Sequence, residues 1–305
     1  MISGTEFNYE PSGPFDLRNQ NKYFGGWPVL AKDPESIVLS FPVEGWEGSA
    51  AVVLKQTPAG LVEGKIYAEI SATSTARAKA KRQALAALSL DINAQAWPNV
   101  GDRDKVIGSL QQQYNYLRPT LFHSPYEAAA SFIIGHRISI KQARAIRQRL
   151  AEEFGEKMTV DDQVFSAFPL PQTLLKLESI SGLSEQKVER LHAVAQAALD
   201  GWLDRDKLRQ QPVEAALAQL ETLPGVGPFF SQGILFRGAG IADGLTDDDV
   251  LRHGIEYAYK LAKAPSSTDV AKIAEAWRPY QMWAVVLVHI WVRNELGMPP
   301  RTFSK

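Results

Sequence analysis

Apolar residues near the start of the chain recur at the short period that is typical of β-strands. Residues 36–43, 50–56 and 61–70 are rich in Val, Ile, Leu and Ala, and proline- or glycine-containing breaks separate them. The pattern predicts a small antiparallel sheet. Residues 1–35, which precede these strands, are predicted to form loops with one short strand around 15–17. The Ala-rich segment 75–90 predicts a helix packed on the sheet.

After about residue 102 the apolar period becomes helical. Gly, Pro or Asp/Ser clusters separate the periodic segments, as expected at helix boundaries. The predicted helices are 102–117, 125–134, 139–154, 171–178, 184–200, 213–222, 228–237, 249–262, 267–276 and 279–295. We therefore expect an α+β N-terminal domain over 1–104, a small antiparallel sheet with a helix, followed by an all-α region over 105–305.

Composition narrows the chemistry that the chain can carry. Its 305 residues suffice for two or three domains, and the content of 45% hydrophobic and 22% charged residues is ordinary for a globular protein. The sequence has no cysteine, which excludes disulfides, thiol nucleophiles and cysteine-ligated zinc or iron–sulfur clusters. No two of its five histidines have the HExxH spacing, so a transition-metal site is not expected.

Charge and hydropathy bear on partners and location. A net charge of −1 argues mildly against a nucleic-acid coat protein, but it allows one local basic face. No apolar run approaches the roughly 20 residues of a membrane-spanning helix. The first residues lack the basic start and apolar core of a signal peptide. We therefore expect a cytoplasmic protein with no membrane partner.

The most informative segment is the turn Leu223-Pro224-Gly225-Val226-Gly227. The helical segments 213–222 and 228–237 flank it, so it forms a hairpin between two helices. The glycines Gly225 and Gly227 allow positive φ angles and close backbone approach. Amides left unpaired at the start of the second helix suit a phosphate group. The alternative is a tight helix–helix corner without a ligand.

Three consecutive carboxylates, Asp247, Asp248 and Asp249, open the next helix. Capping of the helix explains one of these aspartates, and attraction to the positive end of the helix dipole explains a second. Three adjacent like charges repel, so we expect a further role. If the hairpin binds the phosphates of DNA, a carboxylate opposite it can stabilise positive charge that develops on a sugar ring.

Together these segments resemble the helix-hairpin-helix DNA glycosylase superfamily, and within it the branch of 3-methyladenine DNA glycosylase II. The hairpin, the Arg237-Gly238 pair and the Asp run carry this likeness. Further segments resemble the family's motifs: 122–127 with 133–139, 168–171, 182–187, 277–280 and 289–291. The resemblance covers about 105–295, and the N-terminal sheet more loosely.

The resemblance implies an activity and a set of partners. It implies two helical subdomains flanking a cleft, flipping of a damaged base out of double-stranded DNA, and hydrolysis of its bond to the sugar. Alkylated purines are the implied substrates, in base-excision repair. A monomer associated with the nucleoid is expected, with no required cofactor and no iron–sulfur cluster. In relatives, carbonyls matching those of Leu223 and Val226 hold a monovalent cation.

The family's catalytic aspartate falls on Asp249 when residues are counted without gaps from Gly227. It falls on Asp248 when the apolar register of the following helix is used. We favour Asp249, then Asp248, then Asp247. Phe229 occupies the position where bifunctional relatives carry a Schiff-base lysine, so strand cleavage is not expected.

Aromatic and basic positions complete the predicted site. Phe229 and Trp291 match pocket aromatics that suit cationic bases, and Tyr126 is a candidate for the pocket wall; the alternative for each is core packing. The absence of a bulky side chain at Gly233 implies a wider pocket. The predicted DNA-binding residues are Arg137, which matches the residue that wedges into the duplex, His136, Lys141, and the hairpin residues Gly225, Val226 and Gly227.

Two points of the predicted DNA surface stay open. Arg137, Lys141 and Arg144 lie at i, i+4 and i+7, which predicts one basic helix stripe, or else a solvated charged face. His136 replaces the family's usual Gln, which puts in doubt the contact that this Gln makes to the opposite strand.

Other functions remain compatible with the sequence. One is a DNA-binding protein that keeps the hairpin but is catalytically weak or inactive. Another is a glycosylase for a different lesion, such as an oxidised or deaminated base. A helical scaffold without DNA is the least specific alternative.

Overall fold

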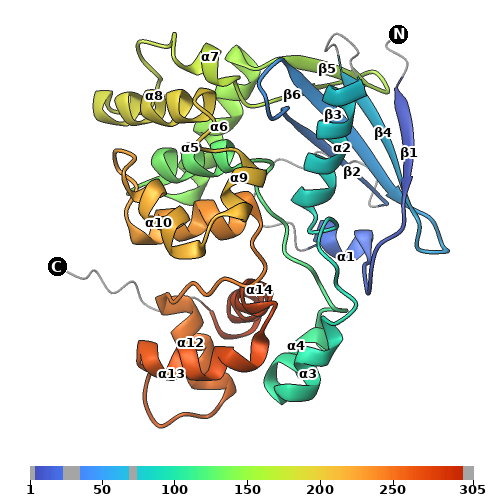
Figure 1. The fold of residues 1–305 in the computed structure, drawn as a ribbon, viewed down its shortest axis with the longest axis vertical. Helices are drawn as coiled ribbons and strands as arrows, with labels where there is room; N and C mark the ends of the chain where they lie inside the picture. The colour runs from blue at the N-terminus through green and yellow to red at the C-terminus, as the bar shows by residue number, and fades with distance from the viewer. Residues whose placement is uncertain (1–3, 23–34, 69–73, 298–305) are drawn as a thin grey trace.

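The computed structural model describes residues 4–22, 35–68 and 74–297, and these begin with a four-stranded antiparallel sheet (Figure 1). Its order is β1-β4-β3-β2. The strands are β1 (Thr5–Tyr9), β2 (Ser36–Pro42), β3 (Ser49–Gln56) and β4 (Val62–Ala68). The three predicted strands are therefore confirmed, although residues 69–70 lie outside the described residues.

The strand predicted around 15–17 is wrong. The first strand is β1, and Leu17 instead begins helix α1 (Leu17–Lys22). Asp16 Oδ1 accepts hydrogen bonds from the backbone amides of Arg18 and Asn19, at 3.0 and 3.2 Å. Such side-chain capping starts a helix rather than a strand.

Both faces of β2, β3 and β4 are covered because alternate residues of these strands pack on different elements, whereas the edge strand β1 leaves Glu6 and Asn8 exposed. Ile37, Leu39 and Phe41 of β2 pack against helix α2 (Ser74–Ala87), whereas Val38 packs against a hairpin on the opposite face. The sequence prediction missed this hairpin, β5 (Lys157–Val160) and β6 (Gln163–Ser166). Its two-residue turn, Asp161-Asp162, has positive φ angles of 46° and 62°, which aspartate tolerates without glycine.

The predicted helix 102–117 divides at Asp104 into α3 (Pro98–Arg103) and α4 (Lys105–Gln113). Asp104 Oδ1 accepts from the amides of Val106 and Ile107 and so starts a new helix. Its Oδ2 accepts from Trp277 Nε1 at 2.8 Å. Because α3 packs on α4, the domain boundary at residue 104 stays a prediction.

The other helices agree in existence with the predicted ones, apart from the short helix α9, which was missed. They are α5 (Pro125–Gly135), α6 (Ile140–Phe154), α7 (Pro171–Leu174), α8 (Glu185–Leu199), α9 (Arg205–Gln210), α10 (Val213–Glu221), α11 (Pro228–Gln232), α12 (Asp249–Ala258), α13 (Ser267–Ala274) and α14 (Gln281–Trp291). Two π-helices, η1 (Gly233–Ala239) and η3 (Val292–Leu296), continue α11 and α14, and a 3-10 turn, η2 (Glu275–Trp277), follows α13.

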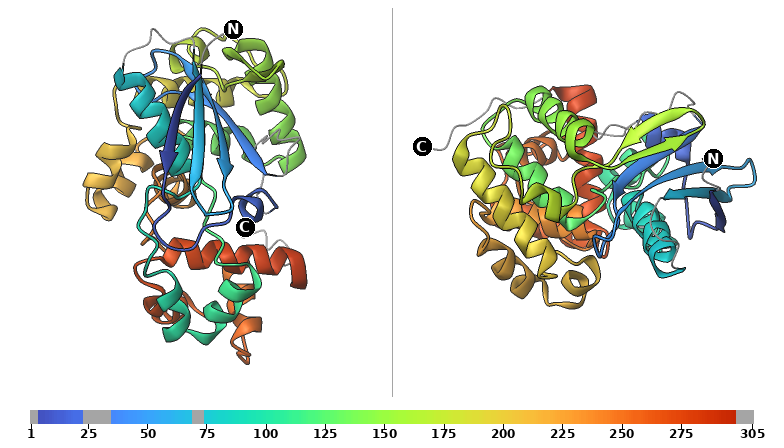
Figure 2. Two further views of the ribbon diagram at one scale, coloured as in Figure 1. Left: turned by 90° about the vertical axis from the view of Figure 1, so that its right-hand side faces the viewer. Right: turned by 90° about the horizontal axis from the view of Figure 1, so that it is seen from above.

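The helices form two groups that share one apolar core. Helices α5 to α11 lie beside the sheet, whereas α3, α4 and α12 to α14 lie together at the other end (Figure 1). Turning the molecule shows α14 crossing below the ends of the strands (Figure 2). The predicted fold class, a small sheet followed by a mainly helical region, is confirmed. Within 4–22, 35–68 and 74–297, the helices are all too short or too polar to span a membrane.

Candidate active site

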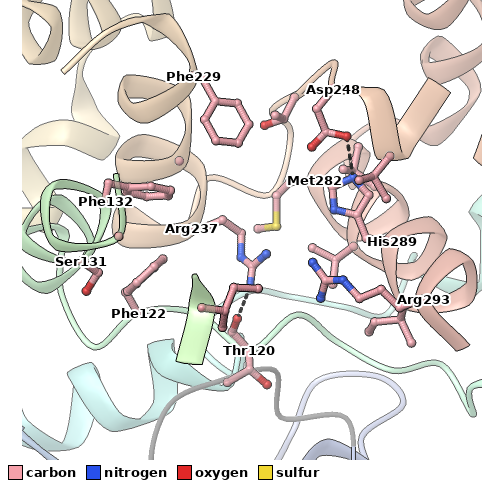
Figure 3. Close-up of a pocket in the computed structure, with 18 of the residues that line it drawn as sticks. Thr120, Phe122, Ser131, Phe132, Phe229, Arg237, Asp248, Met282, His289 and Arg293 are labelled. Atoms are coloured by element: carbon pink, nitrogen blue, oxygen red, sulfur yellow. Dashed lines mark hydrogen bonds and ion pairs between the residues drawn. The ribbon is translucent and has the colours of Figure 1, made fainter. Parts of the chain in front are cut away.

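A cavity of about 500 Å³ lies between the two helical groups. Helices α5, α6 and α11 with η1 form one wall, and α14, η3 and the segment before α12 form the other (Figure 3). This volume is within the range of small-molecule sites. The cavity thus brings together side chains that are more than 100 residues apart in the sequence.

Asp248 is the carboxylate of the Asp run that lines this cavity. It is the N-cap of α12, and its Oδ1 accepts from the Leu251 amide at 2.8 Å and pairs with His289 Nε2 at 3.1 Å. Burial alone raises the pKa of Asp248. The hydrogen bond and charge of His289, together with backbone amides of the cap, outweigh this effect and hold the pKa below its usual value. Asp248 is therefore a carboxylate at neutral pH.

The two neighbouring aspartates are placed differently. Asp247 forms a two-pronged ion pair with Arg252, with both N–O distances at 2.7 Å. Asp249 is exposed and is not among the residues that line the cavity. Of the two favoured candidates, Asp248 and not Asp249 therefore lies at the cavity, where it pairs with His289 of the facing helix α14. Which of them is catalytic stays a prediction.

Aromatic rings from three segments form the wall opposite His289 (Figure 3). Phe132 lies 5.6 Å from Phe122 and 6.4 Å from Phe229, between ring centroids, and all three line the cavity. Phe229 is 54% exposed, which agrees with its predicted place in the pocket. The sequence analysis gave no role to Phe122 or Phe132. Phe122 begins the matching segment before α5, and Phe132 lies on α5 next to the segment 133–139, and these positions were the only signal for them.

The expectation of a wider pocket at Gly233 is wrong. A Cβ atom built at Gly233 would lie 2.2 Å from Cζ of Phe132. The Phe132 ring therefore already fills the space that the missing side chain leaves. The wall keeps its aromatic character, but the ring comes from α5 instead of η1.

Two other predicted pocket aromatics lie elsewhere. Tyr126 is 0% exposed, and its hydroxyl donates to the Pro169 carbonyl at 2.9 Å, so it packs in the core. Trp291 is not among the residues that line the cavity, and its ring lies against Tyr257 at 6.4 Å. Residues two apart on a helix face different directions, so Trp291 cannot share the cavity face of His289.

The hairpin has the predicted shape. Gly225 has a φ of 83°, Gly227 is the N-cap of α11, and Val226 is buried. The Leu223 carbonyl accepts a hydrogen bond from the Val226 amide at 3.0 Å, which closes the turn. The roles of these residues in holding a phosphate or a cation stay predictions. Among the described residues, no three His, Asp or Glu side chains are placed to share a metal ion.

The turn between α5 and α6 is basic and lies beside the hairpin. Arg137 has a φ of 56° and precedes α6, so the predicted helical stripe of Arg137, Lys141 and Arg144 is wrong as a stripe. All three side chains are nevertheless exposed. The pKa of His136 is lowered first by burial and then by the nearby positive charges of Arg137, Lys187 and Arg190. Lys187 and Arg190 thus add positive charge that the sequence analysis did not assign.

The base of the cavity carries two arginines, Arg237 and Arg293 (Figure 3). Arg237 Nη2 donates to the Thr120 carbonyl at 2.7 Å. Burial and the neighbouring Arg293 lower the pKa of Arg237 to about 10, so it remains a cation at neutral pH. From the sequence, Arg237 was predicted only as part of the Arg-Gly pair, because no local pattern places Arg293 beside it.

Comparisons with known proteins agree with this architecture, although no family model matches the chain. DNA-3-methyladenine glycosylase 2 of Escherichia coli (strain K12) is 28% identical over 170 residues, which cover 54% of this chain and 56% of that protein. A DNA-3-methyladenine glycosylase of Bacillus subtilis (strain 168) is 23% identical over 52% of this chain and 54% of its own length. The chain thus spans about half the length of the curated relatives it matches.

Solved structures match over a longer span. The 3-methyladenine DNA glycosylase from Archaeoglobus fulgidus has a TM-score of 0.78 at 18% identity, covering 94% of this chain and 98% of that one. An 8-oxoguanine glycosylase/lyase from Clostridium acetobutylicum has a TM-score of 0.68 at 15% identity, covering 96% and 99%. The chain therefore has the fold of the helix-hairpin-helix DNA glycosylase superfamily, and part of its sequence resembles DNA-3-methyladenine glycosylase 2.

Proposed function

We propose that this protein is a DNA N-glycosylase that hydrolyses the base–sugar bond of alkylated purines in double-stranded DNA. The observation that carries the proposal is the position of Asp248, ionised at the edge of a cavity of about 500 Å³ with an aromatic wall. A cavity of this size accommodates one flipped base. The sequence likeness to proteins named DNA-3-methyladenine glycosylases supports alkylated bases as the substrate class.

In the proposed reaction the base leaves with the electrons of the bond to C1′, and the sugar acquires oxocarbenium character. The Asp248 carboxylate stabilises this positive charge, and water supplies the hydroxyl at C1′. A methylated purine with a fixed positive charge leaves as a neutral base, so the proton that water releases passes to the carboxylate or to solvent. His289 positions Asp248 by holding Oδ1, which leaves Oδ2 to face the sugar. The rings of Phe122, Phe132 and Phe229 stack on the base.

The proposal includes hydrolysis without strand cleavage. A lyase needs an amine that forms a Schiff base with C1′. Phe229 stands at the position of that lysine, and the described residues that line the cavity include no lysine. The proposed DNA contacts are the hairpin Gly225–Gly227 and the exposed cations Arg137, Lys141 and Arg144. Arg137 is also proposed as the residue that wedges into the duplex.

The test is release of free base from randomly methylated duplex DNA under single-turnover conditions. We expect the wild type to release 3-methyladenine or 7-methylguanine. Asp248→Asn is expected to lower the rate by about 10²- to 10³-fold, the effect typical of removing one electrostatic stabiliser. Asparagine caps helices as well as aspartate, so the fold should be kept. Asp249→Asn is the matched control and should retain most of the activity.

Other outcomes select the alternatives. A wild type that binds the duplex but releases no base would contradict the proposal and favour a catalytically inactive DNA-binding protein. Release from oxidised or deaminated duplexes alone would keep the enzyme but change the lesion. Loss of activity in Asp249→Asn, with an active Asp248→Asn, would overturn the assignment of the carboxylate.

A further inference from the structure

Arg237 is a cation at the base of the cavity, and the described part of the chain places no countercharge against it. Within the described residues it makes no ion pair, and its one hydrogen bond goes from Nη2 to the Thr120 carbonyl. Its Nε is buried without a hydrogen-bond partner. A buried charge that lacks partners is costly, because desolvation is not offset. The guanidinium therefore has donor capacity that the described residues do not use.

A second cation lies next to it. Arg293 lines the same cavity and is close enough to lower the pKa of Arg237. Both arginines are on π-helical segments, η1 and η3, and π-helical turns occur frequently at functional sites. Figure 3 shows the Arg237 guanidinium at the centre of the cavity and the Arg293 guanidinium beside it, below His289. Two neighbouring cations make this end of the cavity electropositive.

We propose that Arg237 and Arg293 select an uncharged modified base that directs an oxygen or an unprotonated ring nitrogen at the guanidiniums. This inference rests on the proposed function and ranks its substrates: both kinds of lesion enter the cavity, and the neutral kind is bound more tightly. A neutral base with such an edge supplies the acceptor that Arg237 lacks. A base with a fixed positive charge, such as 7-methylguanine or 3-methyladenine in DNA, meets two like charges instead. Ring stacking favours both kinds of base, so the arginines decide between them.

The experiment compares binding rather than excision, because cationic bases leave faster even without an enzyme. Duplexes carry one lesion on a 2′-fluorinated sugar, which resists hydrolysis. The neutral probe is 1,N6-ethenoadenine, and the cationic probe is 7-methylguanine. Each affinity is divided by that of the undamaged duplex. We expect Arg293→Met to shift the ratio of the two corrected affinities by about tenfold toward the cationic lesion.

Arg144→Met is the matched control, because Arg144 lines the cavity from α6 and is also exposed. Arg144→Met is expected to weaken binding of both lesion-containing duplexes equally and to leave the ratio of the two corrected affinities unchanged. Arg293 is exposed, so Arg293→Met should fold. Arg237→Lys keeps the charge but not the planar fork of donors, so it should weaken binding of the neutral lesion alone.

An equal effect of Arg293→Met on both lesions would overturn the inference, since that is the behaviour of a phosphate contact. A ratio that Arg293→Met shifts toward the neutral lesion would overturn it too. Because binding is measured without turnover, a protein that excises no base would refute the proposed function while still giving this ratio.

Discussion

Replacing Gly233 by alanine tests how firmly Phe132 fills the pocket wall. The new Cβ would lie 2.2 Å from Cζ of the ring, a distance that forces a displacement. Phe132 cannot move freely, because its ring is 5.6 Å from Phe122 and 5.1 Å from Phe230. Overpacking of this kind costs about 1–3 kcal/mol.

A second effect has the opposite sign. Gly233 has helical angles, φ −61° and ψ −41°, and alanine is about 1 kcal/mol more favourable than glycine in a helix. Gly233→Ala should therefore destabilise the wild type by about 1 kcal/mol net. In a Phe132→Ala background the clash is absent, so the same change should stabilise the protein by about 1 kcal/mol. The coupling between the two positions is then about 2 kcal/mol.

Equilibrium unfolding in urea of the four proteins of this cycle measures the coupling. The single variants alone do not suffice, because Phe132→Ala also removes the packing of a partly buried ring. A change of sign of the Gly233→Ala effect between the two backgrounds is the expected result. Equal effects of Gly233→Ala in both would refute the account, since the ring would then not occupy the space beside Gly233.

The remaining predictions concern the carboxylate, the pocket aromatic and the helix caps. His289→Phe removes the interactions that hold the pKa of Asp248 below its usual value, so this pKa rises and the acid limb of the pH–rate profile should move to higher pH. His289→Gln keeps a hydrogen-bond donor and should move the limb less. An acid limb that moves in neither variant would argue against the Asp248–His289 interaction. Phe229→Lys places an amine in the cavity and should give a protein–DNA adduct that borohydride traps, whereas the wild type gives none. Asp104→Ala removes the cap of α4 and leaves the Trp277 indole N–H unpaired, so it should lower the free energy of unfolding in urea by about 2–4 kcal/mol. A decrease of less than about 1 kcal/mol would show that neither hydrogen bond contributes much to stability.

The amino-acid sequence by itself determined features that depend on neighbouring residues. Strand-like runs separated by breaks predicted β2, β3 and β4, with clear alternation in β2, and the helical period with its breaks predicted most of the helices. The glycines of the hairpin and the Asp run located the two segments that flank the cavity. These patterns are readable because backbone angles, capping and burial period are set locally. The hairpin β5–β6 was missed because its turn has aspartates where glycine is the usual signal.

Only the tertiary structure decided how the site is assembled. The packing of α12 against α14 distinguishes Asp248 from Asp249, because His289 lies 41 residues away in the sequence. Phe132 fills the space at Gly233 from another helix, and Arg293 approaches Arg237 from η3. Trp291 matches a family motif but faces Tyr257 instead of the cavity. Direction and proximity of this kind depend on how helices pack across the core, which no local period of the sequence encodes.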